Sequence, residues 1–263
     1  MLNFTFSIVD FEYYLMILVR VVSFFQVAPF FRLPGVPGRI KIGLCAMVSL
    51  LVFENTDLTG LHYEGVMEYG FLVMEEALVG MSLGFALYAC DAIITFAGTL
   101  IDMYIGFSMA QEYNPVTQQQ NSVTGTMYDN LIMLLLLTTS MYHYVVSAIC
   151  DTFKLMPVGG IVVQWDHLYE AVLGYITNLF LLGFRISLPV FACMLVMNAV
   201  LGVMAKVAPQ MNMFAVGMQI KIIVGLVIIM LTLFLLPYVA DFLATEMKTL
   251  FVDILKGFYD ART

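Results

Sequence analysis

The stretch Ile222–Ala240 reads IIVGLVIIMLTLFLLPYVA and contains no charged residue. A helix needs about 20 mainly apolar residues to cross a hydrocarbon core about 30 Å thick. Lipid cannot hydrogen-bond the backbone, so a single crossing segment must satisfy its own amides and carbonyls as a helix. This stretch therefore predicts a membrane-spanning helix, and it guides the interpretation of the rest of the chain.

Five more apolar regions precede it, at residues 8–28, 40–53, 66–110, 130–150 and 171–204. We expect an all-α, polytopic integral membrane protein whose single membrane domain, residues 1–263, contains about six long, kinked helical segments that form hairpins. The second region is short for a full crossing. The third and fifth are longer than one crossing, which leaves a re-entrant hairpin as an alternative in each. Arg185 and Pro189 interrupt the fifth.

The composition excludes several classes of protein. The chain is 62% hydrophobic and only 11% charged, with a mean hydropathy of +0.94. A soluble domain carries about 25% charged residues. The net charge of this chain is −8, and its 11 Lys and Arg residues are scattered, which argues against nucleic acid binding. The four cysteines form no CxxC pair and are expected to be small packing residues.

The distribution of charge predicts an orientation. Asp10 and Glu12, without a basic region, argue against a cleaved signal peptide, so the first helix is expected to stay. The first connection is basic, with Arg32, Arg39 and Lys41, whereas residues 54–68 contain acidic residues but no Lys or Arg. Cytoplasmic loops favour Lys and Arg. Six crossings with both ends outside would place the first, third and fifth connections in the cytoplasm.

Several ionisable residues lie within the apolar regions. A charge at the bilayer centre costs at least about 2.5–3.5 kcal/mol, so such residues face protein or water. They could form a proton or ion relay, but structural pairing within a helical assembly is the favoured interpretation. No catalytic, nucleotide or metal motif accompanies them, so we expect neither an enzyme nor a cofactor. The residues are Arg20, Glu75, Glu76, Asp91, Asp102, Arg185 and Lys221.

Small residues predict where helices approach closely. Gly80, Gly84 and Gly98 lie in one overlong region. Small side chains let helix backbones come together inside a membrane. The end of the chain, residues 245–263, has apolar residues at helical spacing among charges, and predicts an amphipathic helix on a membrane face or a partner.

The connection at residues 106–125 reads GFSMAQEYNPVTQQQNSVTG and is long, polar and almost uncharged. Amide side chains of this kind can line or block a wet passage without creating a strong field. An ordinary solvent-exposed loop is the alternative, and the residue types alone leave both open.

Motifs along nearly the whole chain resemble those of the FliR/SctT family, the export-gate subunits of flagellar and type III secretion systems. The resemblance rests on the order of several blocks, each weak alone. They are Ala28-Pro29-Phe30, Val36-Pro37-Gly38-Arg39-Ile40-Lys41, Gly106-Phe107-Ser108, Asn114-Pro115, Leu155-Met156-Pro157-Val158-Gly159 and Ala208-Pro209-Gln210-Met211-Asn212-Met213-Phe214. The second block fits the flagellar branch better.

The resemblance implies a multi-pass subunit of the bacterial cytoplasmic (inner) membrane, in the flagellar basal body. One such subunit would join FliP-type and FliQ-type membrane subunits around a pore and dock an FlhB-type subunit, to export unfolded flagellar proteins. Residues 171–243 would form a hairpin resembling the FliQ-type partner. The chain would also contact membrane lipid, and it would not bind nucleic acid.

The same resemblance assigns roles to residues of two connections. The turn after Gly106 would be a plug inside the pore, with Gly106, Phe107, Met109, Glu112, Tyr113, Asn114 and Pro115 as candidates. A cytoplasmic loop would contact partners through Lys206, Pro209, Gln210, Asn212 and Lys221. The rival hypothesis is a stand-alone secondary transporter or channel, favoured by the charges within helices and by the interrupted fifth region.

Overall fold

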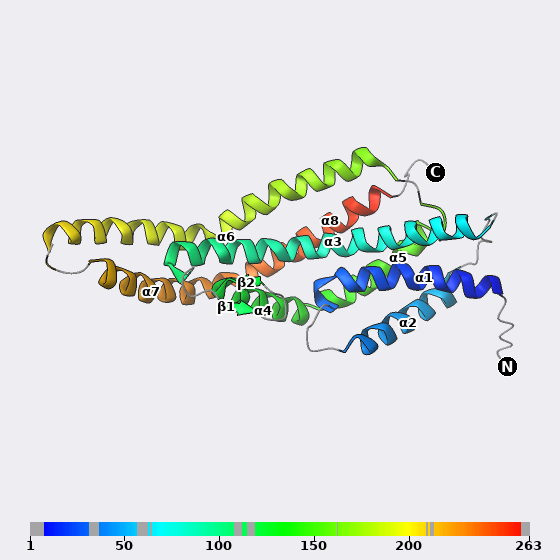
Figure 1. Ribbon diagram of the computed structural model, residues 1–263, viewed down its shortest axis with the longest axis horizontal. Coiled ribbons are helices and arrows are strands. Elements are labelled where there is room, and N and C mark those ends of the chain that lie inside the picture. The colour runs from blue at the N-terminus through cyan, green and yellow to red at the C-terminus, as the bar shows by residue number, and fades with distance from the viewer. Residues whose placement is uncertain are drawn as a thin grey trace. The chain divides into compact units, whose positions relative to one another are not determined.

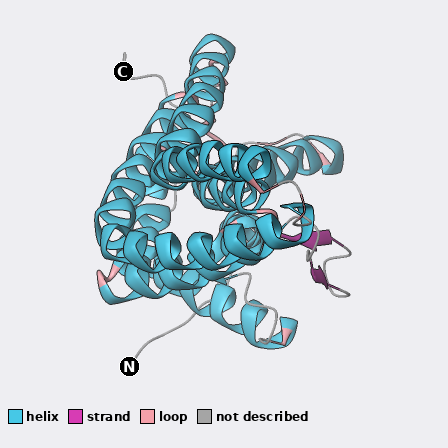
Figure 2. Ribbon diagram, turned by 90° about the vertical axis from the view of Figure 1, so that its left-hand side faces the viewer, coloured by secondary structure: helices cyan, strands magenta, loops and turns pink. Residues whose placement is uncertain are grey.

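The computed structural model describes residues 8–31, 37–56, 63, 65–107, 112–114, 119–161, 163–208, 210 and 213–258. These residues are almost entirely helical, as Figure 2 shows, and the expected all-α class is confirmed. The elements, labelled in Figure 1, are α1 Ile8–Val27, η1 Pro29–Phe31, α2 Gly38–Asn55, α3 Val66–Ile105, β1 Glu112–Asn114, β2 Gln119–Asn121, α4 Val123–Thr138, α5 Met141–Leu155, α6 Trp165–Val207, α7 Met213–Thr232, η3 Leu233–Leu235 and α8 Leu236–Lys256.

The two overlong apolar regions are each one continuous helix. Helix α3 has 40 residues and α6 has 43, so neither contains the re-entrant hairpin that the sequence left open. Pro189 lies inside α6 without ending it. Proline is tolerated in membrane helices where neighbouring groups satisfy the freed carbonyl.

A break between helices lies instead in the apolar region at residues 130–150, where the sequence shows no interruption. Helices α4 and α5 meet at an angle of 72°. Between them Ser140 has a φ of 58°, in the left-handed region that non-glycine residues rarely adopt. The apolar region over residues 130–150 is therefore divided between two helices.

Fewer helices than expected have the length and hydropathy of a membrane span. Within the described residues, Val66–Ile105, Trp165–Val207 and Val216–Lys256 qualify, and α4 with α5 would add a fourth if together they form one span. Helix α1 does not qualify, because Asp10, Glu12 and Arg20 lie along its 20 residues. Six simple crossings are not supported by these criteria.

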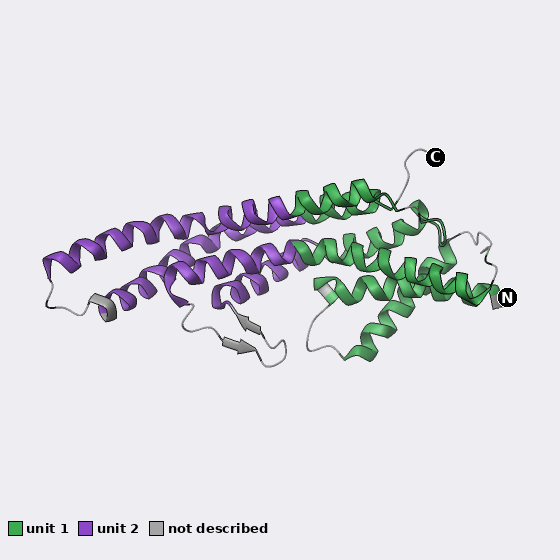
Figure 3. Ribbon diagram, turned by 45° about the horizontal axis from the view of Figure 1, so that its top comes forward, with its two compact units in different colours: residues 1–89, 140–175, 246–263 green, residues 90–139, 176–245 purple. Residues whose placement is uncertain are grey.

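The chain divides into two compact units, coloured separately in Figure 3. Unit 1 comprises residues 1–89, 140–175 and 246–263, and unit 2 comprises residues 90–139 and 176–245. In unit 1, α1 packs on α2, with Tyr14 donating a hydrogen bond to the Ala46 carbonyl at 3.3 Å. Ile93, Ala97 and Ile101 of α3 are buried in unit 2, as are Tyr128 and Ile132 of α4.

The amphipathic end of the chain packs within unit 1. Met247, Phe251 and Ile254 of α8 are buried, and Phe251 meets Phe24 of α1 edge to face at 6.3 Å between ring centroids. The helical pattern of the sequence is present up to Lys256. Its apolar side contacts the chain's own helices.

The cysteines only partly follow the sequence interpretation. Cys45 and Cys90 are buried, whereas Cys193 is exposed on α6.

Candidate functional site

Two glycines bring α1 and α3 into direct backbone contact. A Cβ atom at Gly80 would collide with the Arg20 carbonyl and the Ser23 hydroxyl. At Gly84 it would come within 2.8 Å of the Phe24 carbonyl oxygen. The absence of a side chain at both positions lets the two helix backbones approach closely. The contact brings Arg20 of α1 next to the turn of α3 that carries Glu76.

A fully buried ion pair lies beside this contact. Arg20 Nε donates to Glu76 Oε2 at 2.5 Å, and both side chains are 0% exposed. Arg20 Nη1 also donates to the Met156 carbonyl at 3.0 Å, and the guanidinium lies 4.3 Å from the centroid of the Phe153 ring. The second carboxylate oxygen of Glu76 accepts the Gly159 amide at 3.2 Å.

The pair joins three parts of unit 1 that are distant in sequence: α1, α3 and the turn after α5. That turn is part of the Leu155–Gly159 block of the resemblance. A charge buried in low dielectric is tolerated only when it is paired and hydrogen-bonded. Nη2 of Arg20 is the remaining buried atom of the pair without a hydrogen-bond partner within the described residues. Structural pairing is thus confirmed for Arg20 and Glu76, while the neighbouring Glu75 is exposed.

In unit 2, Asp102 at the end of α3 binds the start of α4, on the other side of the polar connection. Asp102 lies in the last turn of α3 and is fully buried. Its carboxylate accepts the Val123 amide at 2.7 Å and the Thr124 amide at 3.2 Å, at the start of α4. A helix N-terminus has unpaired amides and a positive dipole end, so a carboxylate stabilises it.

Two further contacts fix the same end of α4. The Ser122 hydroxyl caps the helix by accepting the Gly125 amide at 2.8 Å. Gly98 of α3 lies against the Gly125 backbone so closely that a Cβ atom would overlap it. The sequence predicts Gly98 as a packing residue, but its partner and the capping role of Asp102 emerge only from the structure.

The connection itself contains a short antiparallel ribbon. Gly106 ends α3 with a φ of +98°, which glycine adopts without strain. Strands β1 and β2 then pair in the register Glu112 with Asn121, Tyr113 with Gln120 and Asn114 with Gln119. Of the plug candidates, Gly106 and Phe107 are half-buried, Glu112, Tyr113 and Asn114 form β1, and Met109 and Pro115 lie outside the described residues. The Asn-Pro dipeptide is a turn signal that favours such a reversal.

The residues expected in the cytoplasmic loop lie around the end of α6 and the start of α7. Lys206 is exposed in the last turn of α6, where a cation complements the helix dipole. Gln210 is exposed and Lys221 is part-buried within α7. Pro209 and Asn212 lie outside the described residues. Of these candidates, only Lys206, Gln210 and Lys221 are therefore placed.

Long apolar helices, glycine-mediated backbone contacts and a fully buried ion pair together define a multi-pass helical membrane protein. The model of the bacterial export proteins, family 1, matches residues 11–247 of the chain. The chain belongs to this family.

Its relatives include flagellar biosynthetic proteins. The flagellar biosynthetic protein FliR of Pectobacterium carotovorum subsp. carotovorum is 30% identical over 237 residues, covering 90% of each chain. The FliR protein of Escherichia coli (strain K12) is 29% identical over 245 residues, again 90% of each chain. That of Bacillus subtilis (strain 168) is 29% identical over 226 residues, covering 85% of this chain and 87% of the relative. The expected membership of the FliR/SctT family, in its flagellar branch, is confirmed.

Proposed function

We propose that this chain is a structural, pore-forming subunit of the flagellar type III protein export gate in the bacterial inner membrane. It would assemble with FliP-type and FliQ-type subunits, dock an FlhB-type subunit and pass unfolded flagellar proteins. Its family and the names of its relatives support a role in flagellar export. Its part is architectural rather than enzymatic, because the polar groups of the described site hold helices together.

The observation that carries the proposal is the anchored connection between α3 and α4. Asp102 binds the first amides of α4, so both ends of residues 106–122 are held at one place. A tethered, nearly uncharged segment can occupy a passage without electrostatically trapping a charged polypeptide. We assign this segment as the plug of the closed pore.

A deletion tests the plug. Removing residues 111–121 should raise the leakage of small ions or solutes through the assembled gate, since the obstruction is lost while the anchor remains. A Gly-Ser replacement of equal length is the matched control, because it keeps the loop length and removes the side chains. Normal assembly with unchanged leakage in the deletion variant would sink the plug assignment.

Two observations count against the rival, a stand-alone transporter or channel. Helix α6 continues through Pro189, and the Arg20–Glu76 charges are paired with each other. Reconstitution separates the two functions. Solute flux through the purified chain alone would favour the rival, whereas native mass spectrometry of a large complex with partner subunits would favour the gate.

A further inference from the structure

A break in the helical backbone of unit 2 lies between α7 and α8, at η3. Pro237 has no amide hydrogen, so it cannot donate to the Leu233 carbonyl four residues before it, as an α-helix requires. The Leu236 amide donates to that carbonyl instead, and this contact closes the tighter 3-10 turn of Leu233–Leu235. A short 3-10 segment within a long helical stretch often marks a hinge. The proline thus explains why the backbone changes geometry at this point.

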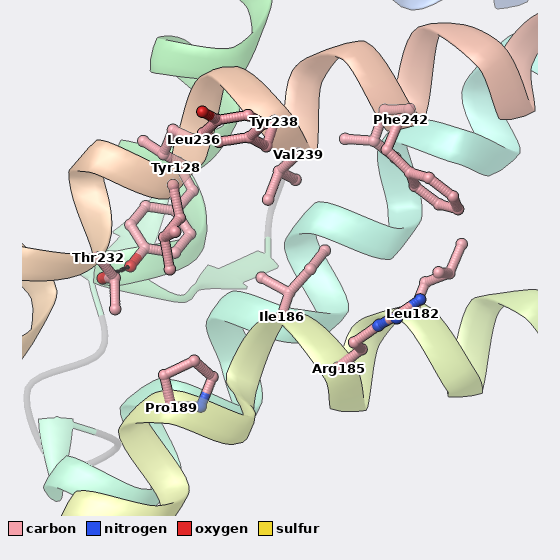
Figure 4. A pocket seen from close by; sticks show the side chains of 12 residues that line it. Tyr128, Leu182, Arg185, Ile186, Pro189, Thr232, Leu236, Tyr238, Val239 and Phe242 are labelled. Carbon is pink, nitrogen blue, oxygen red and sulfur yellow. Dashed lines mark hydrogen bonds between the residues drawn. The ribbon is translucent and has the colours of Figure 1, made fainter.

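Packing within the chain holds this break only weakly. The side chains of Phe234 and Leu235 are 80% and 49% exposed. On its inner side, the break borders a pocket of about 320 Å³, which Leu182 and Ile186 of α6 line from the other side, as Figure 4 shows. Segments with few buried contacts open most easily. The polar contacts next to the break therefore decide how firmly this chain holds it.

One polar contact ties the break to α4. The Tyr128 and Thr232 hydroxyls are 2.8 Å apart, the dashed line in Figure 4, although the residues are 104 positions apart in the sequence. Thr232 directly precedes η3, and its single hydroxyl proton already goes to the Ile229 carbonyl at 2.8 Å. Tyr128 must therefore be the donor between the two hydroxyls. Because Tyr128 is only 2% exposed, loss of this bond would leave a buried hydroxyl without its partner.

The start of α4 is thereby held on two sides. On one side, α3 binds it through Asp102 and through the close contact of Gly98 with Gly125. On the other side, Tyr128 in the second turn of α4 binds the end of α7. The connection at residues 106–122 leads directly into this turn, so a movement at the break would be passed to the end of the connection. All of these residues belong to unit 2.

We propose that the hydrogen bond between Tyr128 and Thr232 is a latch. It couples the proline break between α7 and α8 to the start of α4, and it keeps the connection at residues 106–122 in its closed position. Both are positioning residues, because neither belongs to the connection itself. Their role in closure rests on the proposed plug, whereas the coupling of the break to α4 does not.

Amide hydrogen exchange in the assembled complex tests the coupling. Tyr128→Phe and Thr232→Val each remove the bond, so each should speed exchange about fivefold both in η3 and at residues 124–128. The double variant should exchange no faster than either single variant. Thr232→Ser keeps the hydroxyl and should behave like the parent complex. The matched control is Tyr169→Phe, which removes the same hydroxyl from an exposed position of α6 in unit 1 and should change neither segment.

Leakage of small ions through the assembled gate tests closure, after native mass spectrometry has shown that each variant complex is complete. Tyr128→Phe and Thr232→Val should leak more than the parent gate, and Thr232→Ser should not. Unchanged exchange, additive effects in the double variant, or equal leakage in Thr232→Ser and Thr232→Val would overturn the latch.

The deletion of residues 111–121, measured beside these variants, separates the latch from the plug. If the deletion leaks while Tyr128→Phe and Thr232→Val stay tight, the latch is wrong and the plug stands. If the deletion stays tight as well, both assignments fall.

Discussion

Breaking the buried ion pair from one side should destabilise unit 1 more than any other single change of a charged residue that we consider. In Glu76→Ala, Arg20 stays buried with its charge uncompensated, and the Gly159 amide loses its acceptor. Removing one partner of a buried pair costs about 3–5 kcal/mol. At about 2–4 °C per kcal/mol for a chain of this size, we expect the midpoint of thermal unfolding to fall by about 6–20 °C.

The control is one residue away on the same helix. Glu75 is exposed, so Glu75→Ala removes the same side chain without leaving a buried charge. Its effect should stay within about 0.5 kcal/mol. Thermal unfolding of the purified chains in detergent, followed by circular dichroism, measures both variants. Equal midpoints for Glu75→Ala and Glu76→Ala would refute the reasoning that the pair is buried and coupled.

A double variant tests the physical cause. Arg20→Met with Glu76→Leu removes both charges, so no uncompensated ion remains in the core. It still leaves the Met156 carbonyl and the Gly159 amide without partners, at about 1–3 kcal/mol each. Replacing a buried pair by apolar residues is otherwise neutral or stabilising. The double variant should therefore be more stable than either of its single variants, and a simple sum of the two losses would contradict the coupling.

Three other expectations concern the anchor, the helix contact and the loop before α3. Asp102→Asn should destabilise the start of α4 by about 1–2 kcal/mol, because the charge that complements the helix dipole is lost, and amide hydrogen exchange there should quicken. Gly98→Ala should cost about 1–3 kcal/mol in thermal unfolding, because the added methyl group meets backbone atoms, whereas Gly174→Ala, with open space around it, should stabilise by about 0.5–1 kcal/mol. The hydrogen bond that the Tyr63 hydroxyl donates to Glu12 raises the pKa of the phenol, so its contribution is present below about pH 10 and disappears as the pH rises through the raised value. Tyr63→Phe should therefore be less stable than the parent chain at pH 8 and equal to it at strongly alkaline pH, and a constant difference would argue against this contact.

Much of the local structure could be predicted from residue order alone. The uncharged run at Ile222–Ala240 and the overlong region at residues 66–110 indicate long apolar helices, because hydropathy and helical period are properties of neighbouring residues. Gly80 and Gly84 were recognisable as close-packing positions for the same reason. The block order that resembles the FliR/SctT family is also a property of the sequence, and the comparisons confirm it.

The sequence was a poorer guide wherever a residue's role depends on a distant partner. The sequence indicates that Arg20 and Glu76 are charges that need a partner. They are separated by 56 positions, and only the packing of α1 on α3 brings them together. Asp102 similarly becomes a cap only when α4 folds back next to the end of α3. The 72° break at Ser140 could not be predicted from a glycine or proline, because neither residue lies there.

The sequence by itself therefore determined that this chain is a helical membrane protein of the bacterial export family, because composition, periodicity and motif order are carried by the residues in line. The tertiary structure decided that α6 is one helix rather than a hairpin, that the buried charges of α1 and α3 pair, and that the apolar face of the α8 end is covered by the chain itself. The physical reason is that hydropathy measures only how strongly a side chain avoids water. Whether lipid, a partner or another helix of the same chain covers that side chain depends on which surfaces can pack closely, and in this protein glycine contacts and buried polar bonds select those surfaces.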